Sequence, residues 1–267
     1  MAQRRRLDVE LVRRGLATSR QHAGELVTAG RVSVGGRPAA KPATQVDPAE
    51  AIVICGDDSD RFASRGGHKL TGALDAFEPC GLVVAGRHCL DAGASTGGFT
   101  DVLLRRGAAH VVAVDVGYGQ LVWSLQQDPR VTVRDRQNVR ELVPELLPYP
   151  PELIVADLSF ISLALVLPAL VRCARADADQ VLMVKPQFEV GRSRLGDGGV
   201  VRDPGLRAEA VAGVAAAALE LGLGTRGVVA SPLPGPSGNV EYFLWLAQGA
   251  GPLEVAALER AVAEGPQ

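Results

Sequence analysis

The sequence lacks the features that are typical of proteins with structural metal sites, of secreted proteins and of membrane proteins. Its few cysteines form no Cys-x-x-Cys pair, which argues against a zinc module or disulfide framework and favours small buried side chains in a reducing compartment. No apolar stretch follows the basic N-terminus, so we expect no signal peptide. The longest apolar run, Val211 to Leu223, is shorter than the roughly 20 residues that span a bilayer. We therefore expect a soluble, cytoplasmic protein. The four cysteines are Cys55, Cys80, Cys89 and Cys173.

Net charge is also low, because 28 Lys and Arg nearly balance 30 Asp and Glu among the 267 residues. This balance hides an asymmetry: residues 1–46 have a formal charge of +6 and the rest of the chain has −8. A basic module beside an acidic body suggests a polyanion partner for the module, although a solvated helical face would have the same composition. The basic groups of the module are Arg4, Arg5, Arg6, Arg13, Arg14, Arg20, Arg31, Arg37 and Lys41.

The pattern of the basic module predicts a small α+β unit. Thr18 and Gln21 have the spacing of a capping box, which indicates the start of a helix. Apolar positions recur at helical spacing before and after this box, and then alternate as in strands. The expected elements are a helix at Leu11, Val12 and Leu16 that Gly15 weakens, a helix with the stripe Ala23, Leu26 and Val27 that ends at Gly30, a strand at Val32 and Val34, a turn at Gly35-Gly36, and strands at Val46 and Ile52–Ile54.

The run LVRRGLATSRQHAGELVTAGRVSVGGRPAAKPATQV resembles the S4 RNA-binding domain over roughly residues 7–55. The pair Ser19-Arg20 and the spaced Gly-x-Val-x-Val-Gly-Gly pattern carry this resemblance. It implies that the module binds RNA and that Arg20, Arg31 and Lys41 face RNA phosphates. The full set of expected RNA-binding residues is Arg4, Arg6, Arg20, Arg31, Lys41, Arg65 and Arg192.

From His88 onward strand and helix patterns alternate, which predicts an α/β fold with a doubly wound, mostly parallel sheet. Runs such as VVAVD and LIVAD are continuously apolar, as is typical of strands buried on both faces. The expected strands are His88–Leu90, Val111–Val114, Val131–Val133, Leu153–Ala156 and Val181–Val184. The expected helices are one through Leu70, Leu74 and Phe77, and then Gly98–Arg106, Tyr118–Gln127, Val139–Leu146, Leu163–Ala174 and Leu206–Leu221.

A glycine-rich loop follows the first of these strands. Its glycines allow the backbone to approach a ligand closely in front of a helix N-terminus. The spacing is Gly-x-x-x-Gly-Gly, which fits a nicotinamide or flavin site poorly. Asp91 precedes the loop and Asp115 closes the next strand, where an acid would bind a ribose diol. The arrangement resembles the S-adenosylmethionine loop of class I methyltransferases, with another nucleotide or a structural turn as alternatives. The expected cofactor-binding residues are Asp91, Gly93, Ser95, Thr96, Gly97, Gly98, Phe99, Asp115, Asp135 and Asp157.

Charged residues also stand at other expected strand ends. Asp157 and Lys185 each close a strand, and Glu241 lies at the start of the last, antiparallel strand. Lys69 precedes the first helix of the body. Ligands of α/β proteins bind at the edge where the parallel strands end. Each residue alone could form a surface salt bridge. Together, Lys69, Asp157, Lys185 and Glu241 resemble the tetrad of ribose 2′-O-methyltransferases of the FtsJ/RrmJ type.

The chemistry of ribose methylation explains these residue types. A 2′-hydroxyl is a weak nucleophile that must lose its proton as the methyl group leaves the sulfonium in an in-line displacement. Lys185 would act as a neutral base if burial or Lys69 lowered its pKa, or as a charged donor that orients an oxygen lone pair. The sequence leaves both roles open. Asp157 and Glu241 are expected to orient the two lysines. The Asn-Pro-Pro-Tyr motif of enzymes that methylate exocyclic amines is absent.

Over nearly its whole length the chain is similar to the TlyA family, on motifs such as SRGGHKL, LDAGASTGGFT, ADLSFISL, VKPQFEVG and SPLPGPSGNVEYFLWL. This family is often labelled haemolysin. The resemblance implies S-adenosylmethionine-dependent 2′-O-methylation of cytidines in 16S and 23S ribosomal RNA, since the arm Gln3–Leu7 resembles the subtype that modifies both subunits. Better-known members carry Arg-x-Trp-Val between their domains, whereas this chain has Arg61-Phe62-Ala63-Ser64. If that linker couples RNA docking to cofactor binding, Phe62 must replace the Trp.

The sequence thus predicts an S4 domain at 1–57, a linker at 58–66 and a class I methyltransferase domain with a seven-stranded sheet at 67–267. The expected cofactor is S-adenosylmethionine and the expected partners are ribosomal RNA and ribosomal subunits. We expect a monomer with no metal and no membrane contact. Two other classes of protein are the alternatives. A membrane-lytic haemolysin needs an insertable segment that we do not find. A non-catalytic S4 adaptor would not need the cofactor loop and the two lysines.

Overall fold

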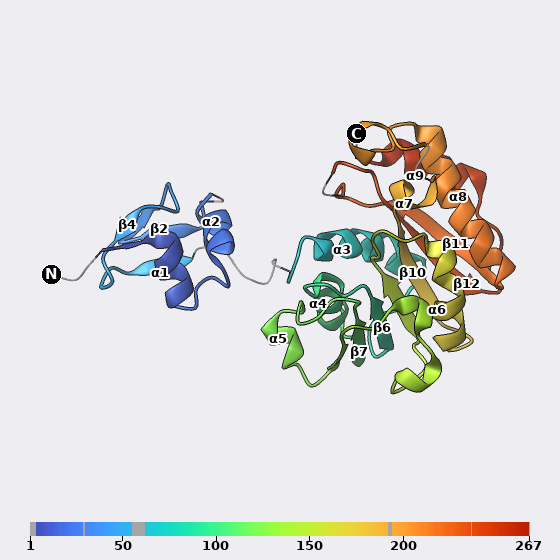
Figure 1. The fold of residues 1–267 in the computed structure, drawn as a ribbon, viewed down its shortest axis with the longest axis horizontal. Coiled ribbons are helices and arrows are strands. Elements are labelled where there is room, and N and C mark those ends of the chain that lie inside the picture. Colours follow the sequence, from blue (N-terminus) through green and yellow to red (C-terminus); the bar gives the residue numbers. More distant parts are fainter. Residues whose placement is uncertain (1–3, 29, 55–61, 192–193, 236, 267) are drawn as a thin grey trace. The chain divides into compact units, whose positions relative to one another are not determined.

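The computed structural model describes residues 4–28, 30–54, 62–191, 194–235 and 237–266. The chain divides into two compact units, residues 1–61 and 62–267 (Figure 1). The second unit therefore begins inside the linker expected at 58–66. The segment from Phe62 packs on the large unit, where the backbone N–H of Ala63 donates to Asp101 Oδ2 at 2.9 Å. Residues 62–66 belong to the large unit for this reason, and residues 58–61 lie outside the described residues.

The described residues of the small unit form two helices, α1 (Leu7–Arg13) and α2 (Arg20–Thr28), and two small antiparallel sheets. Gly35 and Gly36, with φ of +57° and +79°, form the predicted turn, since a two-residue hairpin turn of this type needs positive φ at both positions. The strands are β1 (Arg5–Arg6) paired with β4 (Gln45–Val46), and β3 (Arg37–Pro38), β2 (Val32–Val34) and β5 (Ile52–Ile54) in that order. The core consists mainly of Leu7, Leu11, Ala23, Leu26, Val27, Val32 and Val46.

Two details of the small unit differ from the sequence prediction. The first helix ends at Arg13, and Leu16 lies beyond Gly15, whose φ is +70°. The predicted capping box of Thr18 and Gln21 is wrong. The helix α2 begins one residue later than that box requires, and Ser19 Oγ accepts the hydrogen bond from the His22 N–H at 3.1 Å.

The large unit is built on a seven-stranded sheet of order β11-β12-β10-β9-β6-β7-β8. Strand β12 runs antiparallel to both of its neighbours, and the pairs among β10, β9, β6, β7 and β8 are parallel. This confirms the predicted fold class. The strands are β6 (His88–Ala92), β7 (His110–Val114), β8 (Val131–Arg134), β9 (Leu153–Ala156), β10 (Asp179–Val184), β11 (Leu223–Ala230) and β12 (Tyr242–Gln248).

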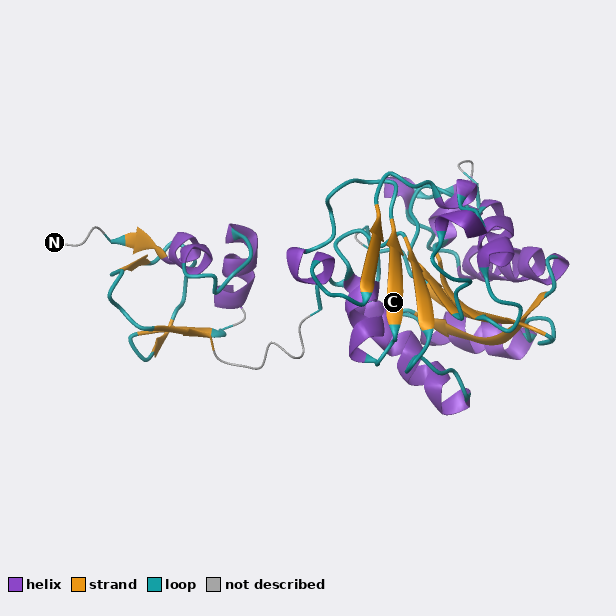
Figure 2. Ribbon diagram, turned by 90° about the horizontal axis from the view of Figure 1, so that it is seen from below, coloured by secondary structure: helices purple, strands orange, loops and turns teal. Residues whose placement is uncertain are grey.

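Helices cover both faces of this sheet and bury two separate cores (Figure 2). Alternate residues of each strand point to opposite faces, so that Cys89 packs in one core and Leu90 in the other. One face is covered by α3 (Gly66–Phe77), α4 (Gly98–Arg105) and α5 (Trp123–Gln126), and the other by α6 (Leu167–Cys173), α8 (Pro204–Glu220) and α9 (Val255–Glu264). A short helix, α7 (Pro186–Glu189), follows β10. No helix among the described residues is long and apolar enough to cross a membrane.

Three expected helices of the large unit are shorter than predicted. Within the helix expected at Tyr118–Gln127, only α5 is helical. The residues before α5 form a loop, because the Asp135 carboxylate accepts from the N–H of Gly119, whose φ is +64°. Proline divides the other two predicted helices. Val139–Leu146 contains 3₁₀ turns at Val139–Glu141 and Pro144–Leu146, and Leu163–Ala174 contains a 3₁₀ turn at Leu163–Leu165 followed by α6, with Pro168 in its first turn. A seventh strand was expected, but its position at β11 was not predicted.

The cysteines are only partly as expected. Cys89 and Cys173 are buried, whereas Cys80 is exposed, because the 3₁₀ turn Glu78–Cys80 after α3 has no buried residue. Cys55 lies outside the described residues. Among the described residues no group of three His, Cys, Asp or Glu side chains has an arrangement that could hold a metal ion.

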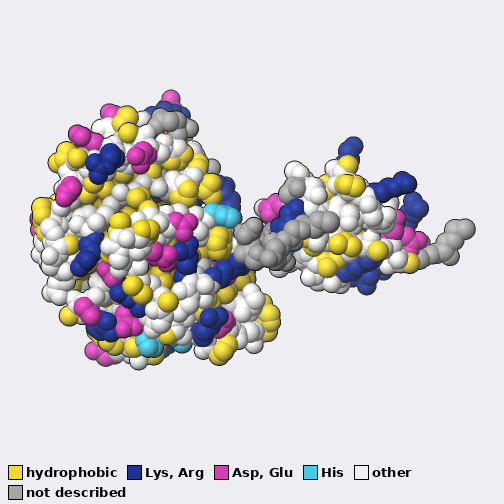
Figure 3. All heavy atoms as spheres, turned by 180° about the vertical axis from the view of Figure 1, so that it is seen from behind, with side chains coloured by type: hydrophobic (Ala, Val, Ile, Leu, Met, Phe, Trp, Pro, Cys, Tyr) yellow, Lys and Arg dark blue, Asp and Glu magenta, His cyan; other side chains and the backbone are white. Residues whose placement is uncertain are grey.

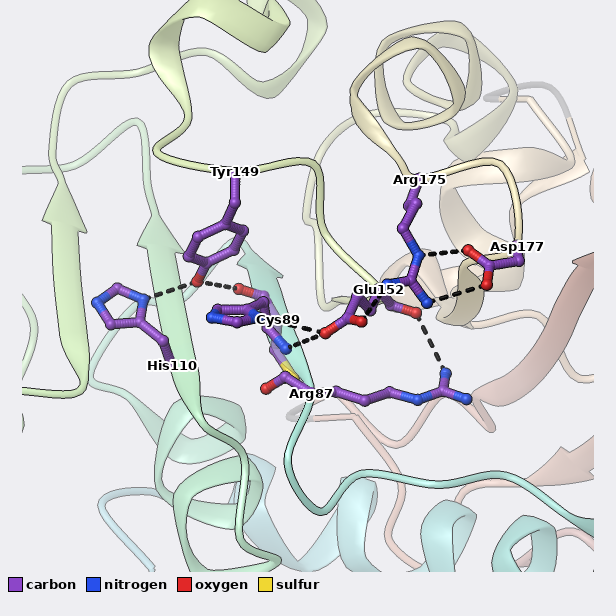
Figure 4. A network of polar contacts seen from close by, with 8 residues as sticks. Arg87, Cys89, His110, Tyr149, Glu152, Arg175 and Asp177 are labelled. Carbon is purple, nitrogen blue, oxygen red and sulfur yellow. Dashed lines mark hydrogen bonds and ion pairs between the residues drawn. The ribbon is translucent and has the colours of Figure 1, made fainter.

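A polar network lies at the edge of the sheet where the parallel strands begin (Figure 4). Arg87, just before β6, contacts the carboxylate of Asp179 at 2.6 Å. The Tyr149 hydroxyl contacts His110 Nδ1 at 2.7 Å, and burial raises the pKa of Tyr149 and lowers that of His110. Arg175 contacts both Glu152 and Asp177. This network stabilises the end of the sheet opposite to the charged strand ends discussed next.

Candidate active site and cofactor cleft

The charged residues at the strand ends meet at one edge of the sheet. Asp157 directly follows β9 and Lys185 directly follows β10. Glu241 directly precedes β12, and because β12 is antiparallel, with Tyr242 opposite Val184, Glu241 lies at the same edge as Lys185. Lys69 comes from the first turns of α3. The four residues thus come from four elements separated by up to 172 positions in sequence.

These residues form two ion pairs, one buried and one at the surface of a cleft, where Asp157 is 25% exposed. Lys69 Nζ lies 2.5 Å from Glu241 Oε2, and the two side chains are 8% and 1% exposed. Lys185 Nζ lies 2.6 Å from Asp157 Oδ1, and Lys185 also donates to Ser159 Oγ at 2.9 Å. An ammonium has three N–H donors. The hydrogen bond to Ser159 uses one of them, and Asp157 lies at ion-pair distance, so Lys185 keeps N–H donors for an oxygen of a substrate.

A cleft of about 320 Å³ opens beside the second ion pair. It is the size of a small-molecule site, and its lining includes Lys69, Asp157, Ser159 and Lys185. Every residue that lines it belongs to the large unit. The cleft-lining residues from the glycine-rich loop are Gly93, Ala94, Ser95, Thr96, Gly98 and Phe99.

The glycines of this loop are required by close approaches of the backbone. A Cβ at Gly93, whose φ is +88°, would lie 2.5 Å from the carbonyl oxygen of Asp157. A Cβ at Gly98, the first residue of α4, would lie 2.2 Å from Ser64 Oγ. The loop therefore brings the N-terminus of α4 against the cleft wall without side chains in the way. Such a cradle of backbone N–H groups and a helix N-terminus fits a nucleoside-containing cofactor.

The three other predicted acids, Asp91, Asp115 and Asp135, do not line the cleft. Asp115 and Asp91 contact the glycine-rich segment, whereas Asp135 holds the segment after β7. Asp115 accepts from the N–H of Ser95 at 2.8 Å and from that of Gly117 at 2.7 Å. Asp135 accepts from the N–H of Gly119 at 2.8 Å. Both follow their strands at the cleft edge of the sheet, and a carboxylate oxygen that accepts one backbone hydrogen bond retains a second lone pair for a ribose hydroxyl.

Asp91 is fully buried beneath the loop. Thr100 Oγ1 donates to its Oδ2 at 2.7 Å, and its Oδ1 has no hydrogen-bond partner among the described residues. Burial above all, together with the nearby Asp157 and Asp115 carboxylates, raises the pKa of Asp91 to about 7, against the lowering effect of Thr100. Gly97 does not line the cleft either. A Cβ at Gly97 would lie 2.3 Å from the Leu125 side chain.

Five cleft residues were not among the predicted site residues. They are Ser64, Gly66, Ala94, Ser159 and Pro234. Ser159 carries a usable signal, because it follows Asp157 by two positions after a strand end. The contact of Ser64 with Gly98 joins segments far apart in sequence and has no local signal.

Phe62 is anchored on the large unit. Its ring lies edge-on to His68 with centroids 5.0 Å apart, and the Arg105 guanidinium lies 4.9 Å from the ring centre. The ring also fills the space over Gly67, where a Cβ would lie 2.3 Å from Phe62. Phe62 therefore holds the start of α3, which carries Lys69, close to α4 and the glycine-rich loop.

The predicted RNA-binding residues are divided between the two units. Arg65 is exposed and lines the cleft. In the small unit Arg4 and Lys41 are exposed, Arg6 and Arg20 both bind the carboxylate of Asp8, and Arg31 is half-buried. Arg192 lies outside the described residues. Lys and Arg side chains stand at the surface of the small unit in Figure 3.

Comparison with known proteins gives two family matches. Residues 62–248 match the FtsJ-like methyltransferase family, and residues 5–52 match the S4 domain. The chain is 62% identical to the 16S/23S rRNA (cytidine-2′-O)-methyltransferase TlyA of Mycobacterium tuberculosis, over 100% of both chains. It is 35% identical to Hemolysin A of Brachyspira hyodysenteriae, over 89% of this chain and 98% of that one. A solved structure of a hemolysin-labelled protein from Streptococcus thermophilus has a TM-score of 0.75 and 37% identity, covering 99% of this chain and 96% of the other.

Proposed function

The chain belongs to the TlyA family of rRNA methyltransferases, with an S4 unit and an FtsJ-like unit, and we propose that its tetrad of Lys69, Asp157, Lys185 and Glu241 directs methyl transfer to cytidine ribose in 16S and 23S rRNA. The enzyme is an S-adenosylmethionine-dependent (cytidine-2′-O)-methyltransferase. The proposal for the tetrad rests on one observation: two ion pairs, Lys69–Glu241 and Lys185–Asp157, lie together at the rim of the cleft that the glycine-rich loop lines.

The cofactor fits the cleft through the residues of the glycine-rich loop. When bound, S-adenosylmethionine supplies an electrophilic methyl group on a sulfonium sulfur. Gly93 and Gly98 would admit its close approach to the backbone and Phe99 would provide an apolar wall. Asp115, which directly follows β7 at the same edge of the sheet just outside the cleft lining, would accept from a ribose hydroxyl. Asp91 holds the loop from below through Thr100.

Lys185 is the residue that meets the target 2′-hydroxyl. Its Nζ is held by the ion pair with Asp157 and the hydrogen bond to Ser159, and it would present a further N–H donor to the substrate oxygen. As a base it would take the 2′-proton, and as a charged donor it would orient the lone pair of that oxygen. Both roles require a fixed nitrogen at the 2′-oxygen, and two contacts of 2.6 and 2.9 Å supply it.

Lys69 and Glu241 support this centre from the side of α3 and β12. Their pair is almost fully buried, so it has one geometry and joins the helix after Phe62 to the edge of the sheet. In the proposal, Lys69 adds positive charge beside the reacting oxygen, and Glu241 holds Lys69 in place. Phe62 stands where the family's linker Trp would be and positions α3 through His68 and Arg105.

The small unit binds the ribosomal RNA through its exposed basic side chains, and the protein acts as a monomer in the cytoplasm, where ribosomal subunits are found.

The proposal is tested with purified protein, S-adenosylmethionine and separate small and large ribosomal subunits that lack the modification. Nucleosides from each RNA are then analysed by mass spectrometry. We expect 2′-O-methylcytidine from both subunits. Methyl groups on bases, or on the ribose of other nucleosides, would overturn the proposal.

A further inference from the structure

Two carboxylates are buried in the most basic part of the chain. Asp8 and Glu10 lie on α1 of the small unit and are 4% and 0% exposed. Together with Glu25 they are the acidic residues of the segment 1–46, whose formal charge is +6. Buried carboxylates occur in proteins almost only where they are paired. These two are paired with arginines that lie at the surface.

Asp8 binds two arginines from different elements. Arg6 of β1 donates from Nε at 3.0 Å and from Nη2 at 2.8 Å, and Arg20 at the start of α2 donates from Nη2 at 3.0 Å. The N–H of Val9 also donates to Asp8 at 2.9 Å. The hydrogen bonds from Arg6, followed by those from Arg20, outweigh burial and lower the pKa of Asp8 to about 2. The carboxylate is therefore ionised at neutral pH.

Glu10 repeats the arrangement two residues further along the helix. Arg13 donates to it from Nη2 at 2.6 Å and from Nε at 2.8 Å, and Arg14 donates from Nε at 2.8 Å. The same arginine contacts lower its pKa to about 2. Arg14 continues to the backbone carbonyls of Pro48 and Glu50. Glu10 thus ties α1 to the chain before β5, whereas Asp8 is surrounded by arginines that face outward.

The exposure of the Asp8 cluster is graded. The Asp8 side chain is 6% exposed, that of Arg6 is 44% and that of Arg20 is 61%. The carboxylate thus holds the inner edges of the two guanidinium groups and leaves their outer edges in solution. A guanidinium group binds phosphate in two-point geometry, and an arginine that is already held loses less conformational freedom when it binds.

We propose that Asp8 is a positioning residue for RNA binding: its buried carboxylate holds the guanidinium groups of Arg6 and Arg20 in a fixed arrangement that receives RNA phosphates. The inference rests on the proposed function, because it takes ribosomal RNA as the partner of the small unit. It has a consequence that charge alone does not predict. Replacing Asp8 with Asn makes the unit more positive and yet weakens its binding to RNA.

The experiment compares the affinities of full-length variants for purified large ribosomal subunits over a range of KCl concentrations. We expect Asp8→Asn to weaken binding by about fivefold, since about two- to tenfold is the scale for the lost ordering of one side chain. The slope of log affinity against log KCl concentration should also become less steep, by about the amount that one phosphate contact contributes. The matched control is Glu25→Gln, which adds the same charge at an exposed site on α2 and should leave binding unchanged or tighter. Affinity for S-adenosylmethionine should be unchanged in both variants.

A second background separates positioning from loss of folding. In a protein with Arg6→Gln and Arg20→Gln, adding Asp8→Asn should change RNA affinity by less than about twofold, because the groups it positions are gone. An equal loss in that background would mean that Asp8 acts by stabilising the unit, and would overturn the inference. Binding by Asp8→Asn as tight as that of the unaltered protein would also overturn it. Absence of methyl transfer by the unaltered protein would instead contradict the proposed function and leave these binding results interpretable.

Discussion

The buried pair Lys69–Glu241 allows stability and catalysis to be separated. Its two side chains are 8% and 1% exposed and lie 2.5 Å apart, so neither charge is solvated if the other is removed. Glu241→Gln keeps the shape of the side chain and removes its charge. Removing one partner of a buried ion pair costs about 3–5 kcal/mol, because the other charge remains buried without compensation. For a unit of this size, about 2–4 °C of melting temperature is lost per kcal/mol, so we expect a decrease of about 6–20 °C.

The double variant Lys69→Met with Glu241→Leu provides the comparison. Two apolar side chains of similar volume leave no buried charge, and such replacements are often neutral or stabilising. We expect its melting temperature to return to within about 3 °C of the original, while methyl transfer stays at least about 100-fold reduced because the charge beside the reacting oxygen is gone. Thermal unfolding followed by circular dichroism and single-turnover methyl transfer are the two measurements. A double variant as unstable as Glu241→Gln, or one that regains activity with stability, would refute this reasoning.

Three further changes test other parts of the site. Gly93→Ala places a Cβ 2.5 Å from the carbonyl of Asp157 at a φ of +88°, and should weaken S-adenosylmethionine binding by at least about tenfold in calorimetry; an unchanged dissociation constant would contradict the cradle. Ser159→Ala removes one of the contacts of Lys185 and should lower kcat by about tenfold with cofactor affinity kept, so a loss of cofactor affinity alone would contradict its role. Asp91 has its folded pKa raised to about 7, above its unfolded value, so its protonation favours the folded state at low pH and this contribution is lost as pH rises from about 4 to 7. Asp91→Asn should therefore gain stability relative to the original protein across that range, by up to about 4 kcal/mol, in urea unfolding at several pH values; parallel curves would contradict the assignment.

Where the sequence pattern was strong, it predicted the fold correctly. Strand β9 was expected with the bounds it has, Leu153–Ala156, because a continuous apolar run ending in an acid leaves little choice. The helix expected at Tyr118–Gln127 was wrong because Asp135, 16 residues beyond Gly119, captures a backbone N–H that a helix would need. Such long-range side-chain contacts are not visible in local periodicity.

The same limit applies to the site. The residue types of the tetrad were expected from a resemblance, but the pairing of Lys69 with Glu241 and of Lys185 with Asp157 depends on strand order and on the reversed direction of β12. Charge counting gave the small unit a basic surface, but it could not show that Asp8 is buried beneath two arginines. Burial is a property of the packed unit and not of the charge pattern.

The central claim is that the tetrad carries out ribose methylation, and it is tested most directly at Lys185. Labelled methyl transfer from S-adenosylmethionine to purified ribosomal subunits is measured for the original protein and for Lys185→Ala, after calorimetry has shown equal cofactor binding, and the label is mapped to base or ribose. The account predicts a methyl group on cytidine ribose that is lost by at least about 100-fold in the variant, because no other described side chain contacts both Asp157 and Ser159 at that position. Transfer by Lys185→Ala at the original rate, or a label on the base, would contradict it.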